Sequence, residues 1–123
     1  MTPWWTPEHA QQWLAAFALT QAFEVPVYAL ALSGAHRSRA EVFMVAFGAS
    51  ALTHPVVWFV MPWLVGEPLW LSIALSEVFA VGVEAAWLAA WKLRAPLRTA
   101  LIANATSFLV GGAIMTLLYT AFF

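Results

Sequence analysis

Long apolar stretches separated by short polar gaps dominate the pattern of this chain. The stretches cover roughly residues 9–33, 41–64, 69–91 and 97–122. A helix needs about 20 mostly apolar residues to cross the hydrocarbon core of a bilayer, and each stretch is long enough. Short gaps are typical of antiparallel neighbours in a helical bundle. The pattern therefore predicts an all-α, polytopic membrane protein, a bundle of four transmembrane helices that forms a single membrane domain, residues 1–123.

The composition supports a lipid environment. Hydrophobic residues make up 63% of the chain and charged residues 9%. A soluble domain normally carries about 25% charged residues, so the main solvent of this chain is expected to be the lipid bilayer. No basic face is available for nucleic acid, which excludes it as a partner. Cysteine is absent, so any metal would need nitrogen and oxygen ligands.

Residues at the helix boundaries carry their own signals. Thr6 is placed as an N-cap, with Pro7 in the first helical turn. Ser38 and Glu41 have the spacing of a capping box at the start of the second helix. These residues predict where the first two helices begin.

The positive charges predict the orientation in the membrane. All five cations lie at two of the gaps: Arg37, Arg39, Lys92, Arg94 and Arg98. In a four-helix protein these gaps are on the same side of the membrane. The positive-inside rule then places loops 34–40 and 92–96 in the cytoplasm and both termini outside. A bacterial inner membrane is the expected location.

Each apolar stretch carries polar residues on one helical face. In chain order these are Gln21, Glu24 and Tyr28; Ser50, Thr53 and His54; Glu77 and Glu84; and Asn104 and Ser107. Residues three, four or seven apart share a face of a helix, so each set is expected to point into the bundle. The sets then form one intramembrane polar cluster. Hydrogen bonding between helices is the alternative interpretation of the uncharged members.

The ionisable residues are the candidate site for a proton or an ion: Glu24, His54, Glu77 and Glu84. A carboxylate at the centre of an isolated transmembrane helix costs about 2.5–3.5 kcal/mol or more, which makes it a functional candidate by default. Such a group is tolerated if it is protonated, paired with a cation, or exposed to a water-filled cavity. Gln21, Tyr28, Ser50, Thr53, Asn104 and Ser107 are the predicted supporting residues.

Two prolines lie near the midplane beside ionisable residues. Pro26 and Pro55 each lack the N–H that a helix uses, next to Glu24 and His54. We therefore expect kinks in the first and second helices. Many transporters build ion sites at such breaks.

The first and third stretches share a local pattern. Residues 19–29 and 75–85 are identical at five of eleven positions, which aligns Gln21 with Glu77 and Tyr28 with Glu84. Each stretch is followed by a basic loop and another helix. The pattern is consistent with a parallel repeat of two hairpins.

Short elements recur across all four stretches: Glu24, Thr53-His54-Pro55, Val83-Glu84, and Asn104 through Ser107 to Gly111. With these elements the chain resembles an uncharacterised group of small bacterial membrane proteins with four helices. That group carries Asn where this chain has His54, so the role of His54 is not implied by the resemblance. The resemblance implies a shared intramembrane site and no particular activity.

Three functions fit these residues. The first is a small transporter or channel-like protein with a site for a proton or cation, working as a homodimer or larger oligomer because four helices are few to enclose a path. A divalent metal bound by Glu24, His54 and Glu77 is one version of this site.

The second is an intramembrane enzyme that uses carboxylate or histidine acid–base chemistry on a lipid or isoprenoid. The sequence contains no strong catalytic motif, which disfavours an enzyme and leaves no catalytic residue assigned. The third is a non-catalytic subunit of a larger membrane complex.

Overall fold

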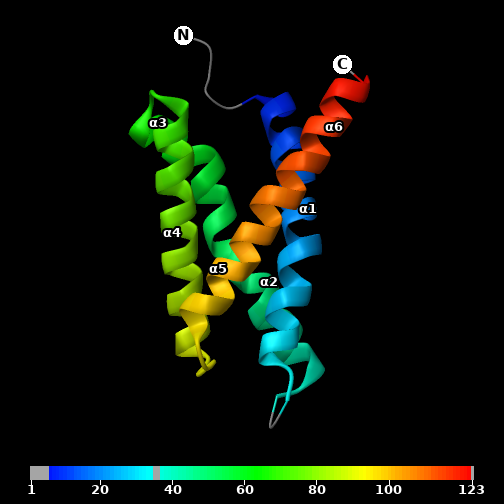
Figure 1. The fold of residues 1–123 in the computed structure, drawn as a ribbon, viewed down its shortest axis with the longest axis vertical. Helices are drawn as coiled ribbons and strands as arrows, with labels where there is room; N and C mark the ends of the chain where they lie inside the picture. The colour runs from blue at the N-terminus through cyan, green and yellow to red at the C-terminus, as the bar shows by residue number, and fades with distance from the viewer. Residues whose placement is uncertain (1–5, 35–36, 123) are drawn as a thin grey trace.

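A computed structural model describes residues 6–34 and 37–122 of the chain (Figure 1). The described residues are helical apart from short connections. The elements are α1 (Pro7–Leu32), α2 (Arg39–Pro55), η1 (Val56–Val60), α3 (Met61–Val65), α4 (Leu69–Ala90), α5 (Pro96–Thr106), η2 (Ser107–Gly111) and α6 (Gly112–Phe122).

Four helices in the described residues are long and apolar enough to cross a membrane. They are Pro7–Leu32, Arg39–Val65, Leu69–Ala90 and Pro96–Phe122. These bounds confirm the four predicted spans to within a few residues. The chain is therefore all-helical, with the helices of a membrane protein.

The predicted caps form at the first two helices. Thr6 accepts a hydrogen bond from the backbone N–H of His9 at 3.1 Å, with Pro7 in the first turn. Ser38 Oγ accepts one from the N–H of Glu41, also at 3.1 Å. These bonds satisfy N–H groups that have no partner within the helix, and so fix where each helix begins.

Two spans contain a π-helical segment, η1 and η2, between α-helical parts. Segment η1 follows directly after Pro55, whose missing N–H interrupts the α-helical bonding. Segments of this kind are rare and often lie at functional sites. In contrast, α1 is α-helical on both sides of Pro26. The predicted kinks themselves stay predictions.

The helices pack closely at one end of the bundle and diverge at the other. Figure 1 shows α4 and α5 together near their connecting loop, whereas α3 and α6 lie well apart at the other end, where α1 begins and α6 ends. We call the first the basic end, because the cations of residues 37–39 and 92–98 lie there, and the second the terminal end.

A continuous apolar core fills the half of the bundle toward the basic end. We call this region the packed half; its buried side chains are Tyr28, Leu32, Val45, Ala46, Ala49, Leu88, Ala100 and Ala103. Trp87 Nε1 donates to the carbonyl of Val45 at 2.9 Å and so links α4 to α2. A Cβ on Gly48 would lie 3.0 Å from the Trp87 ring, so the glycine allows this close approach.

Arg37 closes the packed half at the basic end. Its guanidinium donates to the carbonyl of Leu32 at 3.2 Å and to the carbonyl of Trp91 at 2.7 Å. Both acceptors lie at helix C-termini, where carbonyls lack partners within the helix and carry partial negative charge. One side chain therefore joins the ends of α1 and α4.

Candidate functional site

Two glutamates at the centre of the bundle form the core of the candidate site. Glu24 on α1 and Glu84 on α4 are each 1% exposed. Their carboxyl groups are close enough to interact with each other directly. We call them the glutamate pair.

Hydroxyl groups from two other elements bind the Glu24 carboxyl. Ser50 Oγ on α2 donates to Oε2, and Ser107 Oγ on η2 donates to Oε1 at 2.6 Å. Ser50 is 26 positions and Ser107 is 83 positions from Glu24 in the sequence, so these bonds form only when the helices assemble. Each bond ties α1 to a different neighbour.

The Glu84 carboxyl is held in the same way. Tyr28 OH on α1 donates to Oε1 at 2.6 Å, and Thr53 Oγ1 on α2 donates to Oε2 at 3.0 Å. Asn104 on α5 holds Tyr28 in turn. Its Nδ2 donates to Tyr28 OH at 3.4 Å and to the carbonyl of Ala100 at 2.9 Å. All four spans therefore contribute to one polar network.

Within the described residues, the network consists of carboxyl groups that accept hydrogen bonds and hydroxyl groups that donate them, without a cationic side chain. Every carboxyl oxygen of the pair receives one hydroxyl hydrogen bond. No cationic side chain pairs with either carboxyl among residues 6–34 and 37–122. Two negative charges in contact in a low-dielectric interior repel strongly, so a proton or a bound cation must compensate at least one of them. The arrangement is chemically suited to hold one exchangeable positive charge.

The remaining supporting residue, Gln21, is buried but makes no hydrogen bond to either glutamate of the pair within the described residues. Its Nε2 donates to the carbonyl of Phe47 at 3.2 Å, and its Oε1 has no partner. Gln21 therefore links α1 to α2 as a packing residue. This bond agrees with the alternative interpretation of the uncharged polar residues, in which they form hydrogen bonds between helices.

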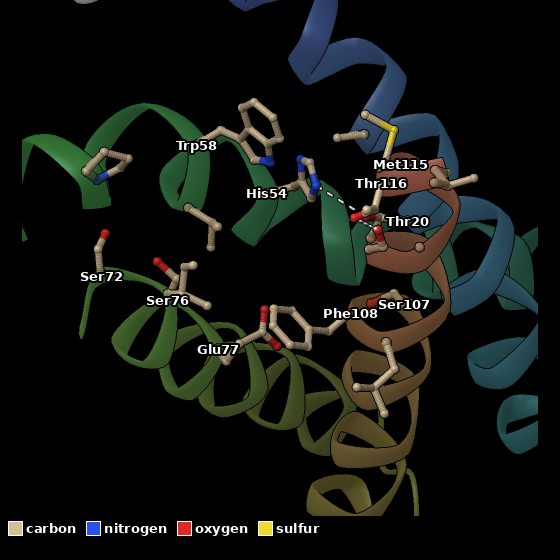
Figure 2. Close-up of a pocket in the computed structure, with 18 of the residues that line it drawn as sticks. Thr20, His54, Trp58, Ser72, Ser76, Glu77, Ser107, Phe108, Met115 and Thr116 are labelled. Carbon is tan, nitrogen blue, oxygen red and sulfur yellow. Dashed lines mark hydrogen bonds between the residues drawn. The ribbon is translucent and has the colours of Figure 1, made fainter. Parts of the chain in front are cut away.

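A cavity of about 800 Å³ occupies the half of the bundle toward the terminal end (Figure 2). We call this region the open half. Elements α1, α2, η1, α4, η2 and α6 all contribute to its walls. Its polar lining consists of His9, Thr20, His54, Ser72, Ser76, Glu77, Ser107 and Thr116. Most of the remaining lining is apolar.

His54 and Glu77, predicted members of the ion site, line this cavity and do not join the glutamate pair. His54 Nε2 lies 3.3 Å from Thr20 Oγ1, and Nδ1 is buried without a partner. Its ring lies among Trp13, Phe17 and Trp58, with centroids 5.3–6.4 Å away.

The predicted metal set of Glu24, His54 and Glu77 is not assembled. The part of the chain that the structure describes contains no group of three His, Asp or Glu side chains that could hold a metal ion. The physical reason is the divergence of the helices, which leaves His54 and Glu77 on the walls of the cavity while Glu24 is enclosed by hydroxyl donors. A metal site formed by these three residues therefore stays a prediction.

Ser107 connects the two regions. It lines the cavity and also donates to Glu24. Glu77 is within electrostatic range of Glu24 across the same gap. Figure 2 shows the Glu77 carboxyl and Ser107 on opposite sides of the cavity, below His54. The side chain of Ser107 thus connects the glutamate pair to the cavity. Tyr28, which bonds to Glu84, belongs to the core of the packed half.

Sequence reasoning missed Thr20 and Ser72 as cavity-lining residues. A signal for Ser72 was present: the buried residues of α4 are spaced by four, as Ser72, Ser76, Ala80, Glu84 and Leu88. Glu77 lies beside this stripe. Glu84 belongs to this buried stripe and Glu77 does not. Their spacing of seven alone would place both on one face of the helix.

No protein family model, curated protein or solved structure matches this chain. The interpretation of the site therefore depends on its geometry.

Proposed function

We propose that this protein is a small transporter or channel-like protein that moves a proton or a small cation across the membrane through the glutamate pair. In this proposal loops 34–40 and 92–96 face the cytoplasm, both termini lie outside, and the membrane is a bacterial inner membrane. The open half then faces outward. A cation entering from outside meets the cavity before it meets the pair.

The observation that carries the proposal is the connection through Ser107. A buried carboxyl pair without a cationic partner, adjoining a cavity, is the arrangement expected of an ion or proton site within a membrane. A structural polar network needs no cavity. The hydroxyl donors on each carboxyl can reorient as charge enters or leaves, because a hydroxyl both donates and accepts.

The packed half provides the barrier on the cytoplasmic side. Tyr28, Leu32, Val45 and Leu88 fill the space beyond the pair. Passage therefore requires a rearrangement that opens this side and closes the other, as in alternating access. The π segments η1 and η2 flank the cavity and are candidate points of movement, since their backbone bonding is already irregular.

We also propose a homodimer or larger assembly. In a single chain α6 diverges from α3 and α4, so one chain alone does not close the terminal end around the cavity (Figure 1). Chemical cross-linking in native membranes tests this. Recovery of monomer alone would contradict it.

Flux measurements in proteoliposomes test the transport proposal. We expect purified wild-type protein to dissipate an imposed gradient of protons or of Na⁺ or K⁺, read with a dye inside the vesicle. Glu84→Gln keeps the shape of the side chain but removes its charge, and flux should fall to that of empty liposomes. Glu67→Gln removes an exposed glutamate at the terminal end and should change nothing. Equal flux in wild type and Glu84→Gln, or no flux of any tested cation, would contradict the proposal.

One observation favours the intramembrane enzyme as a second candidate. The cavity places His54 and Glu77 within largely apolar walls, where a lipid or isoprenoid chain fits and acid–base groups are at hand. Turnover of an added lipid, lost in His54→Ala and kept in Glu84→Gln, would support the enzyme over the transporter.

A further inference from the structure

The cavity in the open half has a volume and lining suited to a small molecule. Its volume of about 800 Å³ lies within the range of about 300–1,000 Å³ that is usual for ligand sites. Such sites are mostly apolar, with a few polar groups that fix the orientation of the ligand. The walls here combine aliphatic side chains and the Trp58 ring with hydroxyls on α1, α4 and η2.

The charge in this cavity has one sign. Among the described residues that line it, Glu77 is the single side chain with a formal charge, and none is Lys or Arg. The Glu77 carboxyl makes no hydrogen bond or ion pair within the described part of the chain, although the side chain is half-buried. Figure 2 shows it pointing away from α4, beside the ring of Phe108 in this view. A carboxylate in this position lacks its counter-ion.

A second group in the same cavity also lacks a partner. His54 Nδ1 is buried and unpaired, while Nε2 is held near Thr20. Aromatic rings surround this imidazole, including Trp58, whose face attracts organic cations. The unpaired nitrogen and the unpaired carboxyl thus lie on α2 and α4, on two walls of one cavity.

We propose that the cavity binds a lipophilic organic cation, an amine or onium group on an apolar body, with its positive charge at Glu77. The apolar walls accommodate the body of the ligand. The ligand's charge compensates Glu77, and the Trp58 ring beside His54 forms part of the wall for the ligand's body. A neutral lipid leaves Glu77 uncompensated, and an anion is repelled by it. This inference names the substrate class of the proposed transporter, and it depends on that function only for the movement of the ligand, not for its binding.

Ser107 lines the cavity and donates to Glu24 Oε1, so a ligand in the cavity lies close to the glutamate pair. A cation at Glu77 lowers the negative potential at Glu24, so the pair holds its own proton or cation less tightly. Binding at one site is therefore expected to favour release at the other, and the coupling is reciprocal.

Binding of tetraphenylphosphonium to the purified protein tests the inference. The readout is isothermal titration calorimetry in uncharged detergent, with triphenylphosphine oxide as the neutral probe and tetraphenylborate as the anion. We expect saturable binding of the phosphonium, weakened by about tenfold or more in Glu77→Gln, because the variant removes the negative charge that attracts the cation; tenfold corresponds to about 1.4 kcal/mol. Glu67→Gln, which removes an exposed charge at the same end, should bind like wild type.

The neutral probe separates charge recognition from simple partition into an apolar space. Its binding should be weak and equal in wild type and Glu77→Gln. Absence of saturable phosphonium binding, equal affinity in wild type and Glu77→Gln, or comparable binding of tetraphenylborate would each overturn the inference. Because the assay needs no flux, failure here with intact proton or cation flux rejects the organic cation alone. Binding without any flux rejects the transport function and keeps the site.

Discussion

The packed half and the open half of this bundle are built from the same four spans but differ in how closely those spans pack. Toward the basic end, small and aliphatic side chains fill the space between helices, and Arg37 joins two helix ends. Toward the terminal end, α6 diverges from α3 and α4, and a cavity replaces the core. The glutamate pair lies where the two regions meet. Glu24 and Glu84, at the boundary between the halves, are enclosed, whereas Glu77, in the open half, lines the cavity. The position of a glutamate relative to this boundary therefore determines whether other side chains enclose it.

Cysteine labelling should show the largest contrast between the halves. The natural chain has no cysteine, so a single substitution gives a unique thiol. We expect Thr116→Cys, at an exposed position on the cavity wall, to react completely with a small water-soluble thiol reagent. Ala49→Cys, within the packed half, should not react until the protein is unfolded. Equal reaction rates in the folded protein, followed by mass spectrometry, would show that the two halves are equally accessible.

Truncation of a core side chain should give the next largest effect. Leu88 is fully buried in the packed half, whereas Leu75 on the same helix is 42% exposed. We expect Leu88→Ala to lower the free energy of unfolding by about 2–4 kcal/mol, because it leaves a cavity among close-packed side chains. Leu75→Ala should cost less than about 0.5 kcal/mol. Unfolding in mixed micelles measures both, and similar values for the two variants would contradict the assignment of the packed half.

Removal of one hydroxyl at the boundary should give the smallest effect on stability. Thr53→Val keeps the shape of the side chain but deletes the donor to Glu84 Oε2. We expect a loss of about 1 kcal/mol, as for other hydrogen bonds between transmembrane helices. Thr116→Val removes a hydroxyl that bonds only to its own helix at Gly112 and is the matched control. A loss no larger than that of the control, in the same unfolding assay, would argue against a Thr53–Glu84 bond.

The spans and the buried faces could be predicted from the sequence because they depend on local periodicity. On α1, Gln21, Glu24 and Tyr28 all point inward, as their spacing indicates. The residues that bind the glutamate pair were among the predicted supporting set: Tyr28, Ser50, Thr53 and Ser107. Asn104, from the same set, bonds to Tyr28.

The division of the ionisable residues into two regions could not be predicted. Glu77 and Glu84 share a face by spacing, but the buried stripe of α4 winds through positions four apart. Which residues meet a neighbour depends on the angle between helices, and that angle results from packing across the whole bundle. The π segments and the cavity also depend on packing across the whole bundle, so local sequence spacing does not predict them. The predicted repeat of two hairpins stays a prediction; in it Tyr28 corresponds to Glu84, and these two side chains meet.

The central claim is that Glu24 and Glu84 act as one site for one positive charge. Cation or proton flux in proteoliposomes, compared among wild type, Glu24→Gln, Glu84→Gln and the double variant, tests it most directly. Residues that act as a unit are strongly non-additive. The account predicts that each single variant loses as much flux as the double variant does. Independent partial losses that multiply in the double variant, or a single variant with wild-type flux, would contradict it.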